Sequence, residues 1–223
     1  MFSVRVEKLT RIYRQDSVEV RALDGVDLDI EKGGFIALVG PSGSGKSTLL
    51  NLIGGLDRPT SGRLWVEDRE LETLSNRELT DLRLRRIGFV FQQYNLIPVL
   101  TAIENVEYVM LLQGVPDEKR GEQARAILAE VGLAGMEDRR PGELSGGQQQ
   151  RVAVARAIVT APALVLADEP TANLDSATGA SLMDMMRRLN ETKGVTFIFS
   201  THDSMVMERA RRLVRLRDGR VVE

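Results

Sequence analysis

The sequence contains no cysteine, one histidine and one tryptophan among its 223 residues. The absence of cysteine excludes a disulfide scaffold, a thiol nucleophile, an iron–sulfur cluster and any cysteine-ligated zinc site. Aromatic residues make up only 4% of the chain, and 30 basic residues are nearly balanced by 32 acidic ones. The resulting formal charge of −2 supplies no global positive field that would draw the chain to nucleic acid or to an anionic membrane surface.

Long hydrophobic runs are also missing. The longest ones, 35–39 and 163–167, are far shorter than the ~20 residues needed to span a bilayer. The start of the chain, Met1–Glu7, lacks the basic segment and apolar stretch of a secretory signal. We therefore expect neither a transmembrane helix nor a signal peptide. A hydrophobic content of 43% still supports a large core, and the length favours one α/β domain over two.

Strand and helix patterns alternate along the chain, which is typical of a parallel sheet flanked by helices. Alternating apolar residues predict two half-buried strands that form an antiparallel edge, at 4–9 and 26–30. Further strands are expected at 35–39, 63–66, 87–91, 164–167 and 195–199, and a hairpin over 213–222 that turns at Asp218–Gly219. Helices are expected at 49–53, 78–86, 102–112, 118–131, 146–159 and 182–189. We predict one domain over 1–223, with a core formed by 1–92 and 161–223 and an inserted helical subdomain at 93–160.

A glycine-rich loop joins the strand at 35–39 to the helix pattern that follows it. It matches the phosphate-binding pattern G-x-x-x-x-G-K-S/T through Gly40, Pro41, Ser42, Gly43, Ser44, Gly45, Lys46, Ser47 and Thr48. Glycines let backbone N–H groups point inward at an anion, and the helix N-terminus adds a positive dipole. The loop predicts a nucleoside triphosphate site in which Lys46 reaches the β- and γ-phosphates and Ser47 ligates Mg²⁺.

Two carboxylates, Asp168 and Glu169, follow the buried strand at 164–167. Ligands of open α/β sheets bind at the carboxyl ends of the strands. We expect Asp168 to hold Mg²⁺ through water, and Glu169 to orient and deprotonate the attacking water as a catalytic base. Taken alone, the pair could equally be acidic residues that only solvate a loop.

The pentapeptide Leu144–Gln148, LSGGQ, resembles the signature motif of ATP-binding cassette (ABC) ATPases. Other motifs follow the family order: an A-loop-like Tyr13, a Q-loop Gln92, a D-loop-like Asn173-Leu174-Asp175 and a switch His202. Segments 54–62 and 100–106 are similar to the MacB, LolD and FtsE group. The resemblance covers essentially the whole chain. It implies an α/β P-loop NTPase core with a parallel sheet, an antiparallel β subdomain and an inserted α-helical subdomain, and an ATPase that uses ATP and Mg²⁺.

The resemblance also implies roles for single residues. Tyr13 would stack on adenine, Gln92 would contact Mg²⁺ or the attacking water, and His202 would hydrogen-bond the γ-phosphate beside Glu169. The nucleotide-binding residues Ser145, Gly146, Gly147, Gln148 and Asp175 would face the nucleotide of a second copy. Two plainer interpretations stay open: Tyr13 as an ordinary strand-end tyrosine, and Ser145 as a helix cap followed by glycines for tight packing.

One motif set per chain implies a head-to-tail homodimer that encloses two ATP molecules. The resemblance further implies an integral membrane permease as a separate partner, a peripheral location at the cytoplasmic face of the inner membrane, and work in lipoprotein release, macrolide export or a related mechanical task. The apolar loop 95–100 would be either a satellite core or the border of a groove for that permease.

Two alternative functions remain: a division ATPase that regulates a cell-wall hydrolase, and an ABC ATPase acting on nucleic acid. The chain lacks a basic stripe, so we expect no nucleic-acid partner.

Overall fold

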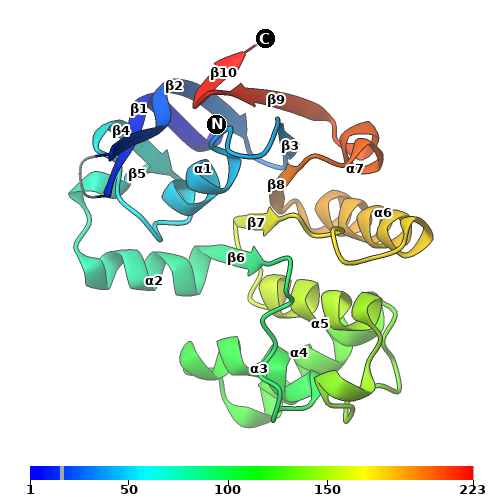
Figure 1. Cartoon of the computed structure of the whole chain (residues 1–223). Coiled ribbons are helices and arrows are strands. Elements are labelled where there is room, and N and C mark those ends of the chain that lie inside the picture. The colour runs from blue at the N-terminus through cyan, green and yellow to red at the C-terminus, as the bar shows by residue number, and fades with distance from the viewer. Residues whose placement is uncertain (16–17, 223) are drawn as a thin grey trace.

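The computed structural model describes residues 1–15 and 18–222, and within them the strands form two sheets (Figure 1). The larger sheet has six strands in the order β10-β9-β3-β8-β7-β6. All neighbours in it are parallel except the hairpin of β9 and β10. Its strands are β3 (Phe35–Val39), β6 (Ile87–Val90), β7 (Leu164–Asp168), β8 (Thr196–Thr201), β9 (Arg212–Arg217) and β10 (Arg220–Val222). The parallel sheet and the terminal hairpin predicted from the sequence are confirmed.

The central strands of this sheet are apolar on both sides, which explains why their sequences show continuous hydrophobic runs instead of alternation. On one face Phe35, Phe197 and Phe199 pack together, with the rings of Phe35 and Phe199 centred 4.6 Å apart. On the other face Ile36 and Ile198 belong to a second apolar cluster. Each central strand therefore contributes to two cores.

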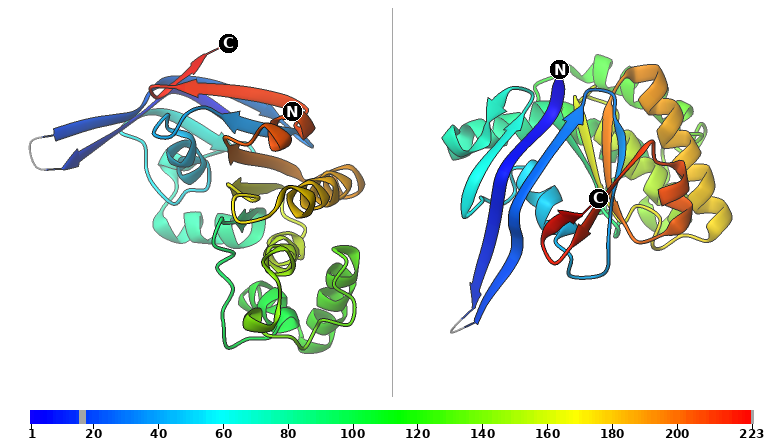
Figure 2. Two further views of the ribbon diagram at one scale, coloured as in Figure 1. Left: turned by 45° about the vertical axis from the view of Figure 1, so that its right-hand side comes forward. Right: turned by 90° about the horizontal axis from the view of Figure 1, so that it is seen from above.

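The smaller sheet is antiparallel, in the order β2-β1-β4-β5. Its strands are β1 (Phe2–Gln15), β2 (Val18–Glu31), β4 (Ser61–Val66) and β5 (Arg69–Glu70). The predicted strands at 4–9 and 26–30 were too short, because β1 and β2 each extend over 14 residues. Their outer halves project beyond the rest of the molecule (Figure 2) and pair with each other, as Arg14 does with Glu19. The outer half of β1 shows no hydrophobic alternation.

The helices are α1 (Lys46–Ile53), α2 (Asn76–Arg86), α3 (Ala102–Leu112), α4 (Asp117–Glu130), α5 (Gly146–Ile158), α6 (Ser176–Lys193) and α7 (Ser204–Arg209), with short 3-10 turns η1 (Leu71–Thr73) and η2 (Pro141–Glu143). Helix α1 lies between the two sheets, and α5 and α6 cover the opposite face of the larger sheet (Figure 1). Helices α3 and α4 pack on α5, farther from the sheet. The stretch 93–160 thus contains α3, α4 and α5.

Two helices differ most from the sequence expectation, whereas α1 and α2 begin only three and two residues earlier than expected. Helix α6 begins at Ser176 and not near 182, because the carboxylate of Asp175 caps its first turn by accepting hydrogen bonds from the N–H groups of Ala177 and Thr178. Helix α7 was not predicted; it is six residues long and is capped by Asp203. Both helix starts depend on a side-chain cap where hydrophobic periodicity is weak.

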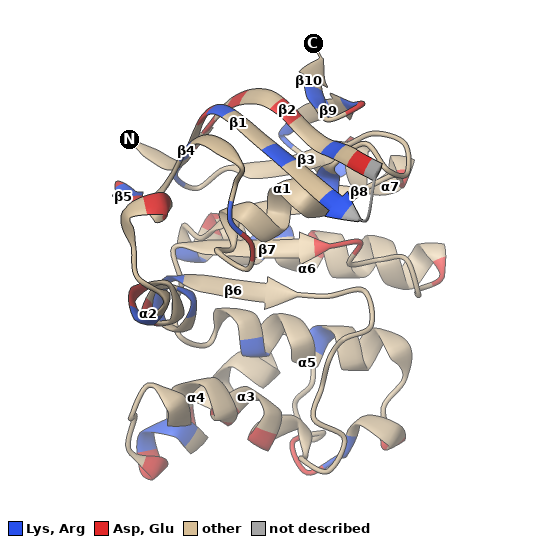
Figure 3. Ribbon diagram, turned by 60° about the vertical axis from the view of Figure 1, so that its left-hand side comes forward, with Lys and Arg blue, Asp and Glu red and all other residues tan. Residues whose placement is uncertain are grey.

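No helix within 1–15 and 18–222 has the length and hydrophobicity needed to cross a membrane. Charged residues lie on the outer strands and the helices, and acidic residues lie at the carboxyl end of β7 (Figure 3). That end of the sheet is where most of the predicted site residues meet.

Candidate functional site

The glycine-rich loop 40–45 connects β3 to α1 and forms one wall of a cleft of about 820 Å³. Gly40 and Gly45 have φ angles of 155° and 102°, a region that other residues rarely adopt. A Cβ at Gly40 would lie 2.1 Å from the carbonyl oxygen of Leu216 on β9, and one at Gly45 would lie 2.5 Å from that of Ala22 on β2. The close approach of these two strands therefore requires both glycines.

Lys46 is buried within this loop although its side chain is charged. Its ammonium group donates hydrogen bonds to the carbonyl oxygens of Gly40 and Pro41, at 2.8 and 3.0 Å. The hydroxyl of Ser44, which is 2% exposed, has no partner among the described residues. A Cβ at Gly43 would meet no atom within 4 Å. The loop thus surrounds open space with a cation and helix N–H groups, which is the donor set that a phosphate chain requires.

The carboxyl ends of β7 and β8 bring oxygen ligands to the start of α1. The Ser47 hydroxyl donates to Asp168 Oδ1 at 3.2 Å, and the Ser200 hydroxyl on β8 donates to the same oxygen. Hydroxyl and carboxylate oxygens are the ligands that Mg²⁺ prefers, usually together with water and substrate phosphates. These residues fit a magnesium ion bound beside a triphosphate. The ion would neutralise the negative charge that develops on the phosphate.

Glu169 and His202 meet at the same end of the sheet. The distance between Glu169 Oε1 and His202 Nδ1 is 2.8 Å, although the two residues are 33 positions apart in the sequence. Glu169 has a left-handed backbone with φ of 46°, and its N–H donates to the carbonyl oxygen of Ser200. Strained backbone of this kind is concentrated at functional sites. The pair places a carboxylate and an imidazole where they can share a proton.

The cleft also includes Tyr13 on β1 and Gln92, just after β6. The main-chain oxygen of Gln92 accepts a hydrogen bond of 2.9 Å from the side chain of Asn173, which ties this loop to the segment after β7. One cavity is thus lined by Tyr13, Gln92, Glu169 and His202 together with the residues Pro41, Ser42, Gly43, Gly45, Lys46, Ser47 and Thr48.

The signature residues lie elsewhere. Ser145 is the N-cap of α5: its hydroxyl accepts a hydrogen bond from the N–H of Gln148, and Gln148 Oε1 accepts one from the N–H of Ser145. Neither Ser145 nor Gln148 is among the described residues that line the cleft, and the same is true of Asp175. The carboxylate of Asp175 caps α6 and accepts a bond from the Thr178 hydroxyl at 2.6 Å, which lowers the pKa of Asp175. The structure thus divides the predicted site residues into two groups.

Three residues of this neighbourhood had no predicted role, although Asn173 belongs to the predicted D-loop-like motif. Ser200 binds the Asp168 carboxylate, Asn173 binds the main chain of Gln92, and Asp57 accepts a hydrogen bond from the Tyr13 hydroxyl. Ser200 stands two residues before His202 at the end of a strand, which is a signal that could have found it. Asp57 lies 44 positions from Tyr13, and no local pattern connects them.

The apolar loop 95–100 is partly a satellite core. The buried amide of Asn105 donates to the carbonyl oxygens of Ile97 and Leu100 and accepts from the N–H of Ile97, while Leu96 packs against the core. Val99, in contrast, is 72% exposed. The satellite-core interpretation accounts for the fixed backbone of the loop but not for Val99.

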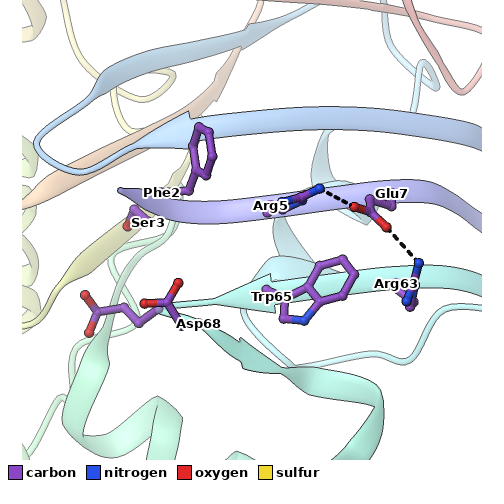
Figure 4. Close-up of a pocket in the computed structure, with 8 residues that line it drawn as sticks. Phe2, Ser3, Arg5, Glu7, Arg63, Trp65 and Asp68 are labelled. Carbon is purple, nitrogen blue, oxygen red and sulfur yellow. Dashed lines mark hydrogen bonds and ion pairs between the residues drawn. The ribbon is translucent and has the colours of Figure 1, made fainter.

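A second hollow, of about 380 Å³, lies on the outer face of the antiparallel sheet (Figure 4). Arg5 and Arg63 both pair with Glu7, at 2.6 and 3.0 Å, and both lie within 6 Å of the ring centre of Trp65. Glu7 pairs with both arginines and none of the predicted site residues lies there, so the cleft at the phosphate loop remains the candidate nucleotide site.

Comparison with known proteins agrees with this geometry. A family profile described as ABC transporter matches residues 23–172. The chain belongs to the ABC transporter family. Its motifs, including the signature and the carboxylates at the end of β7, are those of an ABC ATPase.

Relatives of this ABC cassette support the same classification. An ABC transporter ATP-binding protein of Thermotoga maritima is 47% identical over 211 residues, which is 95% of this chain and 90% of the relative. The macrolide export ATP-binding/permease protein MacB of Hyphomonas neptunium is 47% identical over 219 residues, or 98% of this chain but only 34% of the relative. The cassette therefore spans about a third of that MacB protein.

A solved structure shows the same fold. It is described as the dimeric structure of a post-hydrolysis state of the ATP-binding cassette MJ0796 bound to ADP and Pi, and MJ0796 is a protein of Methanocaldococcus jannaschii. The TM-score is 0.91 with 43% sequence identity, over 99% of this chain and 97% of that chain. The predicted fold, with its parallel sheet and antiparallel β subdomain, is confirmed.

Proposed function

We propose that this ABC cassette hydrolyses ATP at a site shared between two copies, and that the resulting closure and opening of the dimer moves a separate integral membrane permease. The observation that supports the shared site is the separation of the two residue groups. The cleft is lined by residues of the phosphate loop, Glu169 and His202, and Asp168 hydrogen-bonds the lining residue Ser47, whereas the signature residues 145–148 stand outside the lining. A second copy in head-to-tail orientation would supply them.

Each residue of the cleft would have a defined task. Lys46 would exchange its two carbonyl partners for phosphate oxygens, and Ser47 with Asp168 would hold Mg²⁺, with Gln92 as a further ligand. Glu169 would accept the proton of the attacking water as general base. His202, at 2.8 Å from Glu169, would orient that carboxylate and hydrogen-bond the γ-phosphate. Tyr13 would stack on the base.

On the second copy, the start of α5 would bind the γ-phosphate. The N–H groups of Gly146 and Gly147 lie in the first turn of the helix, where no carbonyl of the helix itself can accept them. The helix dipole adds positive potential at the same place. Asp175, which caps the adjacent α6, would belong to the same interface.

The type of work is proposed from the relatives. Identity of 47% to a MacB protein, whose name includes a permease, supports coupling to a membrane subunit in macrolide export, lipoprotein release or a related mechanical task. The cassette would then be peripheral at the cytoplasmic face of the inner membrane. The exposed Val99, in the segment that follows Gln92, would lie at the contact with the permease.

The shared site is tested with Glu169→Gln, which keeps the shape of the side chain and removes the base. We expect ATP binding to persist, an ATP-dependent dimer to accumulate in light-scattering chromatography, and turnover to fall by roughly 10²-fold or more. Wild-type ATPase activity should rise more steeply than linearly with protein concentration. Linear activity across the dimerisation range, or unchanged turnover in the variant, would contradict the proposal.

The membrane partner is tested with a photo-crosslinking residue in cells, placed at Val99 in one strain and at Asp184 in a control strain. Asp184 pairs with Arg209 on the surface of α6, away from the cleft. We expect crosslinks from position 99, and not from 184, to a polypeptide with several membrane-spanning segments. Crosslinks from position 99 only to proteins without such segments would overturn the coupling to a permease.

A further inference from the structure

Tyr13 is held at the rim of the cleft by two charged residues. Its hydroxyl donates a hydrogen bond of 2.8 Å to Asp57 Oδ2, and the guanidinium carbon of Arg11 lies 4.4 Å from the centre of its ring. Arg11 also pairs with Asp57 Oδ1 at 2.9 Å. The three side chains form a closed triangle, which we call the Tyr13 clamp. Because the hydroxyl and one ring face are both engaged, the tilt of the ring is set.

The clamp arises from an irregularity in β1. Its pairing with β2 shifts register between Leu9 and Arg11 and again between Arg11 and Ile12, and such bulges re-aim side chains. The loop after α1 is fastened to this bulge: the N–H of Ile12 donates to Thr60 Oγ1 at 3.0 Å, and the N–H of Thr60 donates to the Thr10 carbonyl oxygen at 2.8 Å. Asp57 lies on that loop and is thereby held against Tyr13.

The two faces of the Tyr13 ring have different surroundings. Tyr13 lines the cleft together with Val20 and Arg21, while Arg11 is not among the described residues that line it. Arg11 therefore covers the ring face away from the cleft, and Tyr13 itself remains 37% exposed. The Arg11–Asp57 pair is about three-quarters buried, with side-chain exposures of 23% and 26%. Cation–π contacts and ion pairs are stronger where water is partly excluded.

We propose that Arg11 and Asp57 are positioning residues, which hold the Tyr13 ring ready to stack on the base of a nucleoside triphosphate. This inference rests on the proposed binding of ATP in the cleft. A ring already fixed in its bound orientation loses less conformational entropy on binding than a free one. Stacking recognises the π face of a base and not its hydrogen-bonding edge, so the clamp should favour ATP and GTP equally. It should add nothing to inorganic tripolyphosphate, which has no base.

The experiment measures dissociation constants of ATP, GTP and tripolyphosphate by calorimetry. We expect Tyr13→Ala to weaken ATP and GTP roughly 5- to 100-fold, the range for loss of one stacked base. Asp57→Ala should weaken both nucleotides about 3- to 10-fold, as expected when one ordered side chain is released. Tyr13→Phe, which removes only the hydroxyl, should have a smaller effect. Tripolyphosphate binding should not change in any of these variants.

Two further measurements separate positioning from a merely structural role. The KM for ATP should rise in Asp57→Ala while kcat at saturating ATP is kept. The double variant Tyr13→Ala/Asp57→Ala should bind ATP no more weakly than Tyr13→Ala, because Asp57 acts through the ring. Asp184→Ala, which breaks a surface Asp–Arg pair outside the cleft, is the matched control and should change no constant. Asp57→Asn is the conservative substitute if the alanine variant unfolds.

The outcomes are distinguishable. Equal weakening of ATP and tripolyphosphate in the Asp57 variants would show that Asp57 supports the phosphate loop and would overturn the clamp. Unchanged ATP binding in Asp57→Ala would overturn it as well. If the wild-type chain binds neither ATP nor tripolyphosphate, the proposed function itself fails.

Discussion

A Cβ placed at Gly43 in the phosphate loop would meet no atom within 4 Å, whereas one placed at Gly147 in the signature segment would lie 2.4 Å from Cγ2 of Thr178 on α6. In the signature segment, glycine is needed because the chain's own side chains press against the helix start: Tyr94 approaches Gly146 and Thr178 approaches Gly147. In the phosphate loop, Gly43 allows an unusual backbone angle beside open space, while Gly40 and Gly45 lie against the backbones of β9 and β2.

This difference indicates how each segment contributes to the site. The phosphate loop holds its own cation, Lys46, and opens into a cleft formed by residues of the same chain. The signature segment packs against Tyr94 and Thr178, and the first turn of α5 does not line that cleft. The phosphate loop therefore forms a wall of the cleft, whereas the signature segment lies outside it. This arrangement agrees with a site completed by a second copy.

The largest effect is expected in the phosphate loop. In Gly40→Ala, the new Cβ would collide with the backbone of β9 and the residue would keep an unfavourable φ, so we expect a loss of about 3 kcal/mol and a fall in melting temperature of roughly 6–12 °C. ATP binding should be lost with it. The control within the same loop is Gly43→Ala, which has open space and should cost only about 1–2 kcal/mol. Similar losses of stability in Gly40→Ala and Gly43→Ala would contradict the steric explanation for Gly40.

A smaller effect is expected for Gly147→Ala. Contact of the new Cβ with Thr178 Cγ2 should cost about 2 kcal/mol, typical of overpacking. Thr178→Ser removes that methyl group and keeps the hydroxyl that donates to Asp175, so the double variant should recover most of the loss. Chemical denaturation of the four proteins measures the coupling. Additive losses would mean that Thr178 is not the neighbour that excludes a side chain.

Gly146→Ala should be milder, at about 1 kcal/mol, because the atom in the way is the hydroxyl at the flexible end of Tyr94, 2.8 Å from the new Cβ. In a Tyr94→Phe background the nearest remaining ring carbon would be 3.7 Å away, and the cost should largely vanish. Since alanine retains the backbone N–H, the double variant Gly146→Ala/Tyr94→Phe should still form the ATP-dependent dimer when Glu169→Gln is also present. Loss of that dimer at restored stability would show that the glycine itself is required at the interface.

The smallest effect concerns pH. Hydrogen bonds from Thr178 lower the pKa of Asp175 from its ordinary value of 3.8, so its contribution to stability is fully present above that value and is lost as the pH falls through the folded pKa. Asparagine at 175 can still cap α6 but does not titrate there. The difference in melting temperature between wild type and Asp175→Asn should therefore shrink from pH 6 to pH 3. A constant difference would rule out the carboxylate as its source.

Much of the fold was predictable where local signals are strong. The runs 35–39 and 164–167 are buried strands because both sheet faces are covered. Helix α3 has the predicted bounds, and its start is defined by a capping box between Thr101 and Glu104. The outer half of β1 was missed because its stability comes from pairing with β2 and not from burial, which leaves no hydrophobic alternation to detect.

Local patterns identified the candidate site residues one by one, and only the resemblance to ABC ATPases implied that the signature residues and Asp175 form a second group. The order of the strands, β3-β8-β7, brings the ends of three parallel strands together. His202, Asp168 and the phosphate loop meet for that reason. The position of α5 beyond the other face of the sheet is what leaves Ser145 outside the cleft.

By itself the sequence determined the local structures: where glycine permits the phosphate loop, where Ser145 and Gln148 cap a helix, and which residue types can hold phosphate and magnesium. Only the tertiary structure decided which of these local structures share a cavity. It also brought Glu169 to His202 across 33 positions and Tyr13 to Asp57 across 44. The physical reason is that a cap or a loop is made from neighbours along the chain, whereas a hydrogen bond between strands exists only after the sheet has brought distant segments together.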